Sequence, residues 1–217
     1  MPNIIENKKF YGKAGYIDTL IEMPKNAPIG YTVLLHPHPM HGGTRDNKVI
    51  STMSRVCLNY DLAVFRPNFR GVGFSEGKFD NGLGEVEDMI DLICQIIEYY
   101  PNLKKIPIIL GGFSFGASIA AQLYSYIKNK DIQCNGLVLV SSAATRYVHK
   151  EIILPEKTFL IHGYNDNIVP FDEILNWAKI HDISINLIPN ASHFFHGKLI
   201  TLKNIFINIL ISILNIK

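Results

Sequence analysis

Short apolar runs alternate with segments of helical periodicity along most of this 217-residue chain. The apolar runs are typical of buried strands and cover residues 31–35, 62–66, 106–111, 136–140, 158–162 and 184–188. The helical segments between and beside them cover residues 48–60, 84–99, 115–128 and 171–181. Apolar strands that alternate with helices predict a mostly parallel central sheet with helices on both faces, so the expected fold class is α/β.

Two further elements frame this pattern. Residues 8–11 and 16–22, joined around Gly12 and Gly15, predict an N-terminal antiparallel hairpin. The tail, residues 199–216, is rich in Ile and Leu, but its polar residues repeat at helical spacing and share one face; they are Asn204, Asn208, Ser212 and Asn215. We therefore expect an amphipathic helix that packs on the core rather than a membrane span.

Length and composition narrow the function classes. A chain of this length predicts a single domain over residues 1–217, and 47% hydrophobic with 18% charged residues is typical of a compact core. The net charge is +2 with scattered basic residues, so no nucleic-acid partner is expected. Residues 1–10 lack the apolar stretch of a secretory signal, and the cysteines, Cys57, Cys94 and Cys134, are interpreted as reduced core thiols. These features predict a cytoplasmic protein; they do not indicate an oligomeric state.

The strand at 106–111 is followed by Gly112-Phe113-Ser114-Phe115-Gly116 and then by a predicted helix. A G-x-S-x-G sequence between a strand and a helix predicts a nucleophile elbow, in which a sharp turn exposes the serine hydroxyl. The flanking glycines fit because such a turn leaves little room for Cβ atoms. Ser114 is therefore the candidate nucleophile.

A serine nucleophile needs a base and an orienting acid, which follow it along the chain in this architecture. Asp166 lies in the loop after the strand at 158–162, and His193 lies in the loop after the strand at 184–188. Asp172 is the alternative acid, but it begins a predicted helix and is better explained as an N-cap. His196 is the alternative base, but it already approaches the tail helix, so Asp166 and His193 are preferred.

The loop His36-Pro37-His38-Pro39-Met40-His41-Gly42-Gly43 follows an early strand, where the second oxyanion-hole donor is expected. The first donor would be the backbone N–H of Phe115. Because prolines have no N–H, the second is His38 or Met40, with His38 preferred. The H-x-H-x-x-H spacing also resembles a zinc-binding run, but Met40 replaces its aspartate, so we expect neither a metal nor a cofactor.

Five motifs in order carry a resemblance to a known family. They are His36-Pro37-His38-Pro39 with Gly42-Gly43, the run from Asn68 to Gly77, Gly112 to Gly116, His162 to Asp166, and Ser192 to Phe195. From about Tyr16 onward, the chain resembles a small bacterial group of predicted serine hydrolases with the α/β-hydrolase fold, related to dienelactone hydrolases. The resemblance implies the triad Ser114, Asp166 and His193. The connection from Ala143 to Glu156 is too short for a lid domain.

These features predict a lidless serine hydrolase that cleaves a small-molecule carboxylic ester or thioester through an acyl-enzyme on Ser114. Apolar walls are expected from Met40, Phe74, Phe113 and Phe194. An amide or peptide hydrolase with the same triad is the alternative within enzymes. The alternative from another class is a binding protein with a vestigial site. In the loop at 69–77, Arg70 is interpreted as a structural ion-pair residue rather than a substrate clamp.

Overall fold

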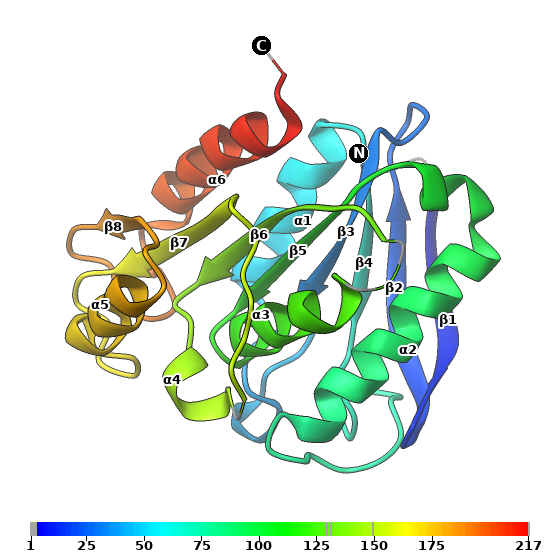
Figure 1. Ribbon diagram of the computed structural model, residues 1–217, viewed down its shortest axis with the longest axis horizontal. Coiled ribbons are helices and arrows are strands. Elements are labelled where there is room, and N and C mark those ends of the chain that lie inside the picture. Colours follow the sequence, from blue (N-terminus) through cyan, green and yellow to red (C-terminus); the bar gives the residue numbers. More distant parts are fainter. Residues whose placement is uncertain (1–3, 129, 131, 149, 217) are drawn as a thin grey trace.

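A single eight-stranded sheet runs through the molecule in the order β1-β2-β4-β3-β5-β6-β7-β8 (Figure 1). The computed structural model describes residues 4–128, 130, 132–148 and 150–216. The strands are β1 (Ile4–Gly12), β2 (Gly15–Met23), β3 (Gly30–Leu35), β4 (Leu62–Pro67), β5 (Ile108–Phe113), β6 (Cys134–Val140), β7 (Thr158–Gly163) and β8 (Ile185–Ile188). The strands β4, β3, β5, β6, β7 and β8 are parallel, while the β1–β2 hairpin joins β4 in an antiparallel direction.

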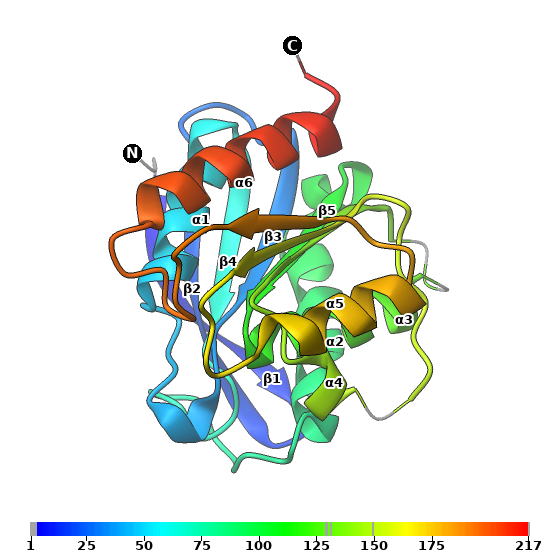
Figure 2. The same ribbon diagram turned by 90° about the vertical axis from the view of Figure 1, so that its left-hand side faces the viewer.

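Helices cover both faces of this sheet. They are α1 (Lys48–Asn59), α2 (Leu83–Tyr99), α3 (Phe115–Ile127), α4 (Ala144–Tyr147), α5 (Phe171–Ile180) and α6 (Leu199–Leu214), with the short 3-10 helices η1 (Pro39–His41) and η2 (Pro101–Lys105). Figure 2 shows α1 and α6 on one side of the sheet and α2, α3 and α5 on the other. Because the strands β3, β4 and β5 are buried along their whole length, the core forms two apolar layers, and the predicted α/β fold is confirmed.

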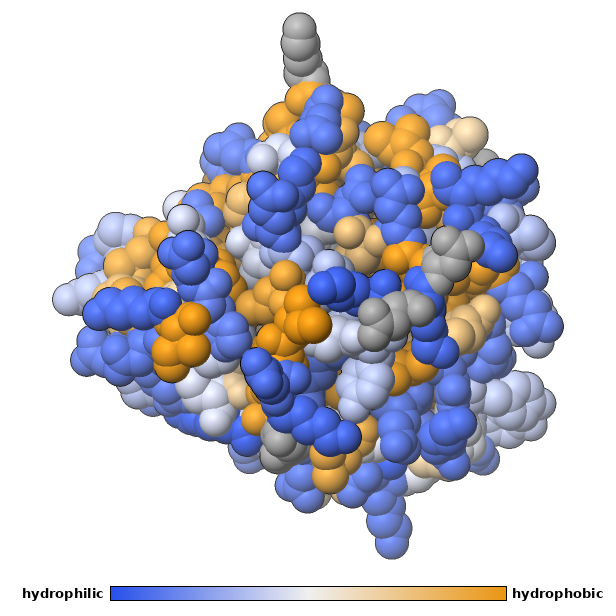
Figure 3. Space-filling view, viewed as in Figure 1, coloured by the Kyte–Doolittle hydropathy of each residue, from blue (hydrophilic) through white to orange (hydrophobic). Residues whose placement is uncertain are grey.

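The tail helix has the predicted amphipathic form. Leu202, Phe206 and Leu210 are buried in the layer shared with α1, whereas the polar residues at 204, 208, 212 and 215 are exposed. No helix among the described residues has the length and apolar character needed to cross a membrane. On the face drawn in Figure 3, hydrophobic residues form separate patches among hydrophilic ones.

The prediction that all three cysteines are core thiols is only partly correct. All three are free, but Cys57 alone is buried, Cys134 is half-buried and Cys94 is exposed. Cys94 lies on α2 beside the buried Ile93, and a helix turns by about 100° per residue, so neighbours in sequence face different environments. Aliphatic neighbours in the sequence therefore did not predict the burial of this thiol.

The carboxyl ends of the parallel strands meet at one edge of the sheet, where their loops lie next to one another. The loops after β3, β5, β7 and β8 carry His38, Ser114, Asp166 and His193 respectively. Residues separated by up to 155 positions in sequence are thus brought to one edge by the strand order alone.

Candidate functional site

Ser114 lies at the turn between β5 and α3 with φ 56° and ψ −116°, a conformation that L-residues rarely adopt. The glycines of the motif make this turn possible. A Cβ at Gly112 would overlap the backbone of Gly116, and a Cβ at Gly116 would overlap the carbonyls of Leu35 and His36. The close packing of β3 against the turn therefore requires both glycines, and it points the serine out of the sheet as the sequence predicted.

The hydroxyl of Ser114 lies beside the ring of His193, with 3.0 Å between Oγ and Nε2. On the far side of the ring, Nδ1 lies 2.7 Å from Oδ2 of Asp166. A carboxylate only accepts hydrogen bonds, so Nδ1 carries the proton and Nε2 presents a lone pair to the serine. The structure thus brings together the three residues predicted as nucleophile, acid and base, and they form one continuous chain of hydrogen-bond contacts.

Asp166 is held by its own turn. Its Oδ1 accepts hydrogen bonds from the N–H groups of Ile168 at 2.9 Å and Val169 at 2.8 Å, which leaves Oδ2 for His193. Burial alone would raise the pKa of this carboxyl. The hydrogen bond and charge of His193, together with the two amides, outweigh burial and hold the pKa of Asp166 below its ordinary value. The carboxylate therefore stays ionised beside the imidazole.

The loop after β3 folds over the serine. Phe115 is the first residue of α3, so its N–H has no acceptor within the helix and lies next to the serine. In the loop itself, the N–H of Met40 already donates to Nδ1 of His38 at 3.2 Å. The same loop is tightened by the carbonyl of His38, which accepts from the N–H groups of His41 and Gly43, both at 3.1 Å. Of the two candidate donors, the amide of His38 is therefore the one that the loop leaves for a ligand.

His36, at the end of β3, ties this loop to its neighbour. Its ring is fully buried; Nδ1 lies 2.7 Å from the Pro37 carbonyl, and Nε2 accepts from the N–H of Phe69 at 2.9 Å. Burial lowers the pKa of His36 to about 4, so the ring is neutral near pH 7. Since both ring nitrogens bind protein groups, His36 does not present the free ligand that the zinc interpretation of this loop requires.

A cavity of about 210 Å³ opens above the serine. It is lined by Pro37, His38, His41, Gly42, Gly43, Asn47, Ser114, Ile168, His193 and Phe194. The ring of His38 is stacked on that of His41 and also packs against Phe79, Phe115 and Tyr147. One wall is therefore built from histidine and aromatic rings, and another from the backbone of two glycines.

The four residues predicted as apolar walls take different places. Phe194 lines the cavity, whereas Phe113 is fully buried and packs against the ring of His193, with 5.0 Å between ring centroids. Met40 and Phe74 are largely exposed, at 69% and 78%, and do not line this cavity. Met40 and Phe74 lie on the connections after β3 and β4, where side-chain direction has no long periodicity to read. Phe113 is the last residue of β5, and its side chain belongs to the buried apolar layer on one face of the sheet.

Sequence reasoning missed Asn47 and Ile168 as lining residues. Asn47 caps the N-terminus of α1, where its Oδ1 accepts from the N–H of Val49 at 2.9 Å. Ile168 follows Asp166 by two positions, on the turn that holds the acid. Proximity to the motifs was the only available signal: both residues lie within five positions of one.

The alternative candidates lie apart from this arrangement. Asp172 is exposed in the first turn of α5, and His196 stacks on Phe194 with 5.9 Å between ring centroids. Arg70 binds Asp88 through Nε at 2.7 Å and the carbonyl of Gly84 through a second nitrogen, as expected for a structural ion pair. No cluster of three metal-ligating side chains occurs within the described ranges.

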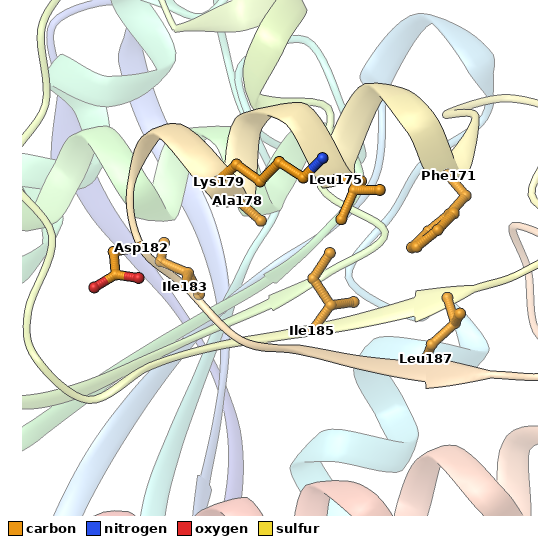
Figure 4. Close-up of a pocket in the computed structure, with 8 residues that line it drawn as sticks. All are labelled: Phe171, Leu175, Ala178, Lys179, Asp182, Ile183, Ile185 and Leu187. Carbon is orange, nitrogen blue, oxygen red and sulfur yellow. The ribbon is translucent and has the colours of Figure 1, made fainter.

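A larger cavity, of about 390 Å³, lies between α5 and the edge strand β8 (Figure 4). Its lining is mostly aliphatic, with Phe171 at one end and Asp182 at the other. It contains none of the residues that surround Ser114. A nucleophile, a base and backbone donors meet only in the smaller cavity, which is therefore the candidate active site.

Comparison with known proteins identifies a family and several similar proteins. The family model described as serine aminopeptidase, S33 matches residues 38–155. An uncharacterized protein of Rickettsia prowazekii is 36% identical over 185 residues, covering 80% of this chain and 74% of its own. An α/β serine hydrolase without a lid from Xanthomonas campestris superposes with a TM-score of 0.88 at 26% identity, covering 98% of this chain and 96% of its own. An α/β serine hydrolase homologue from Coxiella burnetii superposes with a TM-score of 0.82 at 31% identity. The alignment covers 96% of this chain and 97% of the homologue.

Proposed function

The chain belongs to the serine aminopeptidase S33 family of α/β serine hydrolases, and from this premise we propose that it cleaves small carboxylic esters or thioesters through an acyl-enzyme on Ser114. The observation that carries the proposal is the continuous set of contacts from Ser114 Oγ through His193 to Asp166. A hydroxyl is a poor nucleophile unless a base removes its proton, and these contacts supply the base and its orientation.

In the first step, Oγ of Ser114 attacks the acyl carbon while Nε2 of His193 takes its proton. The negative charge that develops on the carbonyl oxygen is stabilised by the N–H groups of Phe115 and His38. Collapse of the tetrahedral intermediate breaks the bond to the alcohol or thiol, which leaves with the proton from His193. Water then attacks the acyl-enzyme by the same route, with His193 as base, and the acid product is released.

The lining of the cavity favours esters over the aminopeptidase activity that the family description names. An aminopeptidase recognises a free α-ammonium group, for which a carboxylate is the usual partner. Among the residues that line the 210 Å³ cavity there is no aspartate or glutamate. Histidine, asparagine and backbone groups instead suit an uncharged acyl or alcohol portion.

Labelling with a fluorophosphonate tests the proposal directly, because only an activated serine reacts. The wild-type protein should be labelled at Ser114 and should hydrolyse short p-nitrophenyl esters. Ser114→Ala should lose both properties while its circular dichroism spectrum stays unchanged. Labelling that persists in this variant would place the nucleophile elsewhere, and no labelling of the wild-type protein would favour a binding protein with a vestigial site.

A matched pair of histidine variants tests the base. His193→Ala should lower kcat by about a thousandfold or more, because the serine then lacks a proton acceptor. His196→Ala, three residues away, should change kcat by less than about threefold, because surface substitutions have small effects. The opposite ranking would assign the base to His196.

A further inference from the structure

His162 is buried at the end of β7, four residues before Asp166, and the proposed mechanism leaves it without a role. Its Nε2 lies 3.0 Å from the carbonyl oxygen of Val169. Because a carbonyl only accepts, Nε2 must carry a proton and donate it to Val169. Burial lowers the pKa of His162, against the opposing effects of the Asp166 charge and the Val169 hydrogen bond, so the ring is neutral near pH 7.

Val169 connects His162 to the acid. The N–H of Val169 donates to Oδ1 of Asp166 at 2.8 Å, while its carbonyl accepts from His162. Val169 thus donates the hydrogen bond that holds the carboxylate and accepts the hydrogen bond that holds the turn. The Nε2 of His162 is also 3.7 Å from Oδ2 of Asp166, too far for a hydrogen bond, so it leaves that oxygen to His193.

The other ring nitrogen has no contact that could replace this one. Val140 on β6 pairs with Ile161 on β7, so Ser141 and His162 follow at neighbouring positions of the register. Within the described residues, Nδ1 of His162 and Oγ of Ser141 are both buried without a hydrogen-bond partner, so the two are not hydrogen-bonded to each other. Among these residues, the contact to Val169 is therefore the one hydrogen bond that fixes the ring of His162.

The remaining charged groups near the ring are those of the site and of α5. The negative charges of Asp166 and Glu173 raise the pKa of His162, and positive charge on His193 lowers it. Glu173 is itself paired with Arg146, at 2.7 Å, so its charge is largely balanced. Among the described residues, no other group donates to the carbonyl of Val169, so this contact depends on the ring of His162.

We propose that His162 is a positioning residue for Asp166: through Val169 it holds the turn that aims the carboxylate at His193. This inference rests on the proposed function, because it assigns to Asp166 the part of the orienting acid. Buried partners of this kind commonly decide how well a site is aligned while touching no substrate.

The test compares four variants by kinetics on a short p-nitrophenyl ester and by carbon-13 NMR titration of the Asp166 carboxyl. His162→Phe should lower kcat about tenfold or more with KM nearly unchanged, since a lost buried hydrogen bond misaligns the acid rather than the substrate. It should also raise the pKa of Asp166, because the amide of Val169 then donates less well. His162→Gln, whose amide can still donate to Val169, should recover most of both properties.

Two further variants separate positioning from loss of stability. Leu160→Ala removes a buried side chain from the same strand, so it should lower Tm while leaving kcat and the Asp166 titration unchanged. Ser141→Ala removes a neighbouring buried hydroxyl but leaves the Val169 contact in place, so it should change kcat by less than about threefold. A loss as large as that in His162→Phe would overturn the proposal.

The proposal is overturned if His162→Phe keeps the wild-type kcat and Asp166 pKa, or if Leu160→Ala reproduces its kinetic effect. If His162→Phe does not fold, His162→Asn, whose shorter side chain does not reach the Val169 carbonyl, takes its place beside His162→Gln. Failure of the proposed function has a different signature: the wild-type protein would lack esterase activity and fluorophosphonate labelling. The Asp166 titration needs no turnover, so it still decides whether His162 holds the carboxylate.

Discussion

The backbone of Ser114 combines a positive φ with a ψ of −116°, and this conformation opposes folding by about 1–3 kcal/mol in similar cases. Glycine adopts it without that cost, although it also gives the unfolded chain more freedom. Strain at this residue is therefore a property that mutation can measure separately from activity.

We expect Ser114→Gly to be more stable than Ser114→Ala by about 1 kcal/mol, since both variants lose the hydroxyl and only alanine keeps the strained Cβ. Urea denaturation of the two inactive variants measures the difference. Equal midpoints would mean that the turn relaxes when the serine is replaced and that the strain is not intrinsic to the fold.

His36 gives a pH dependence of stability. The pKa of His36 is about 4 in the folded protein, and it returns to the ordinary value of 6.5 in the unfolded chain. Between these two pH values the unfolded chain therefore binds more protons than the folded protein. The contribution of the neutral ring is complete above pH 6.5 and is lost as the pH falls toward 4, by up to about 3 kcal/mol. In His36→Gln, the decrease in unfolding free energy from pH 7 to pH 4.5 should be smaller than in the wild-type protein. An unchanged decrease would mean that other groups cause the acid sensitivity.

At the scale of elements, the loop after β3 depends on two adjacent glycines, and each is needed for a different structural reason. Gly42 has a φ of 75° with open space around its missing Cβ, whereas a Cβ at Gly43 would overlap the carbonyls of Pro37 and His38. Gly42 is required by conformation, and Gly43 by the close approach of the chain to itself.

Gly43→Ala should therefore displace the backbone around His38 and lower kcat by about a hundredfold, the effect of losing one oxyanion-hole donor. Gly42→Ala is the matched control: it should cost about 1 kcal/mol of stability through its positive φ and change kcat little. Steady-state kinetics with thermal denaturation distinguishes the two. A wild-type kcat in Gly43→Ala would show that the loop is not an essential part of the site.

The regular elements were predicted well because their periodicity is strong. The helix expected over 115–128 forms over Phe115–Ile127, and the strand expected over 184–188 forms over Ile185–Ile188. The contacts of Ser114, Asp166 and His193 also match the prediction from motif order. The short helices η1 and α4 were missed, since three or four residues carry no detectable period, and the cavity lining was missed because loop side chains follow local packing.

At the scale of the whole molecule, the described part of the connection between β6 and β7 consists of the four-residue helix α4 and irregular chain. A cavity of about 210 Å³ holds about seven groups of the size of a water molecule, at about 30 Å³ each. The site therefore has room for a short acyl group and no cover that could move over a long one.

We expect kcat/KM to rise over the first carbons of the acyl chain, by about 0.8 kcal/mol for each buried CH₂, and to level off at about six carbons. Activity should not increase when the substrate forms micelles, and chelators should have no effect. A series of p-nitrophenyl esters from two to sixteen carbons, assayed below and above the critical micelle concentration, measures this. A maximum at sixteen carbons, or a rate increase at the micelle surface, would contradict it.

The distribution of the site over four loops has a consequence for refolding experiments. The base follows β8, at the far edge of the sheet, whereas the nucleophile follows β5 near its centre. Both are present only when β5 to β8 are assembled, so a chain that has regained its helices but not β8 does not hydrolyse an ester substrate. Hydrolysis recovered after dilution from denaturant would thus count only molecules in which this part of the sheet is complete, and its lag behind the far-ultraviolet signal would time the addition of β8.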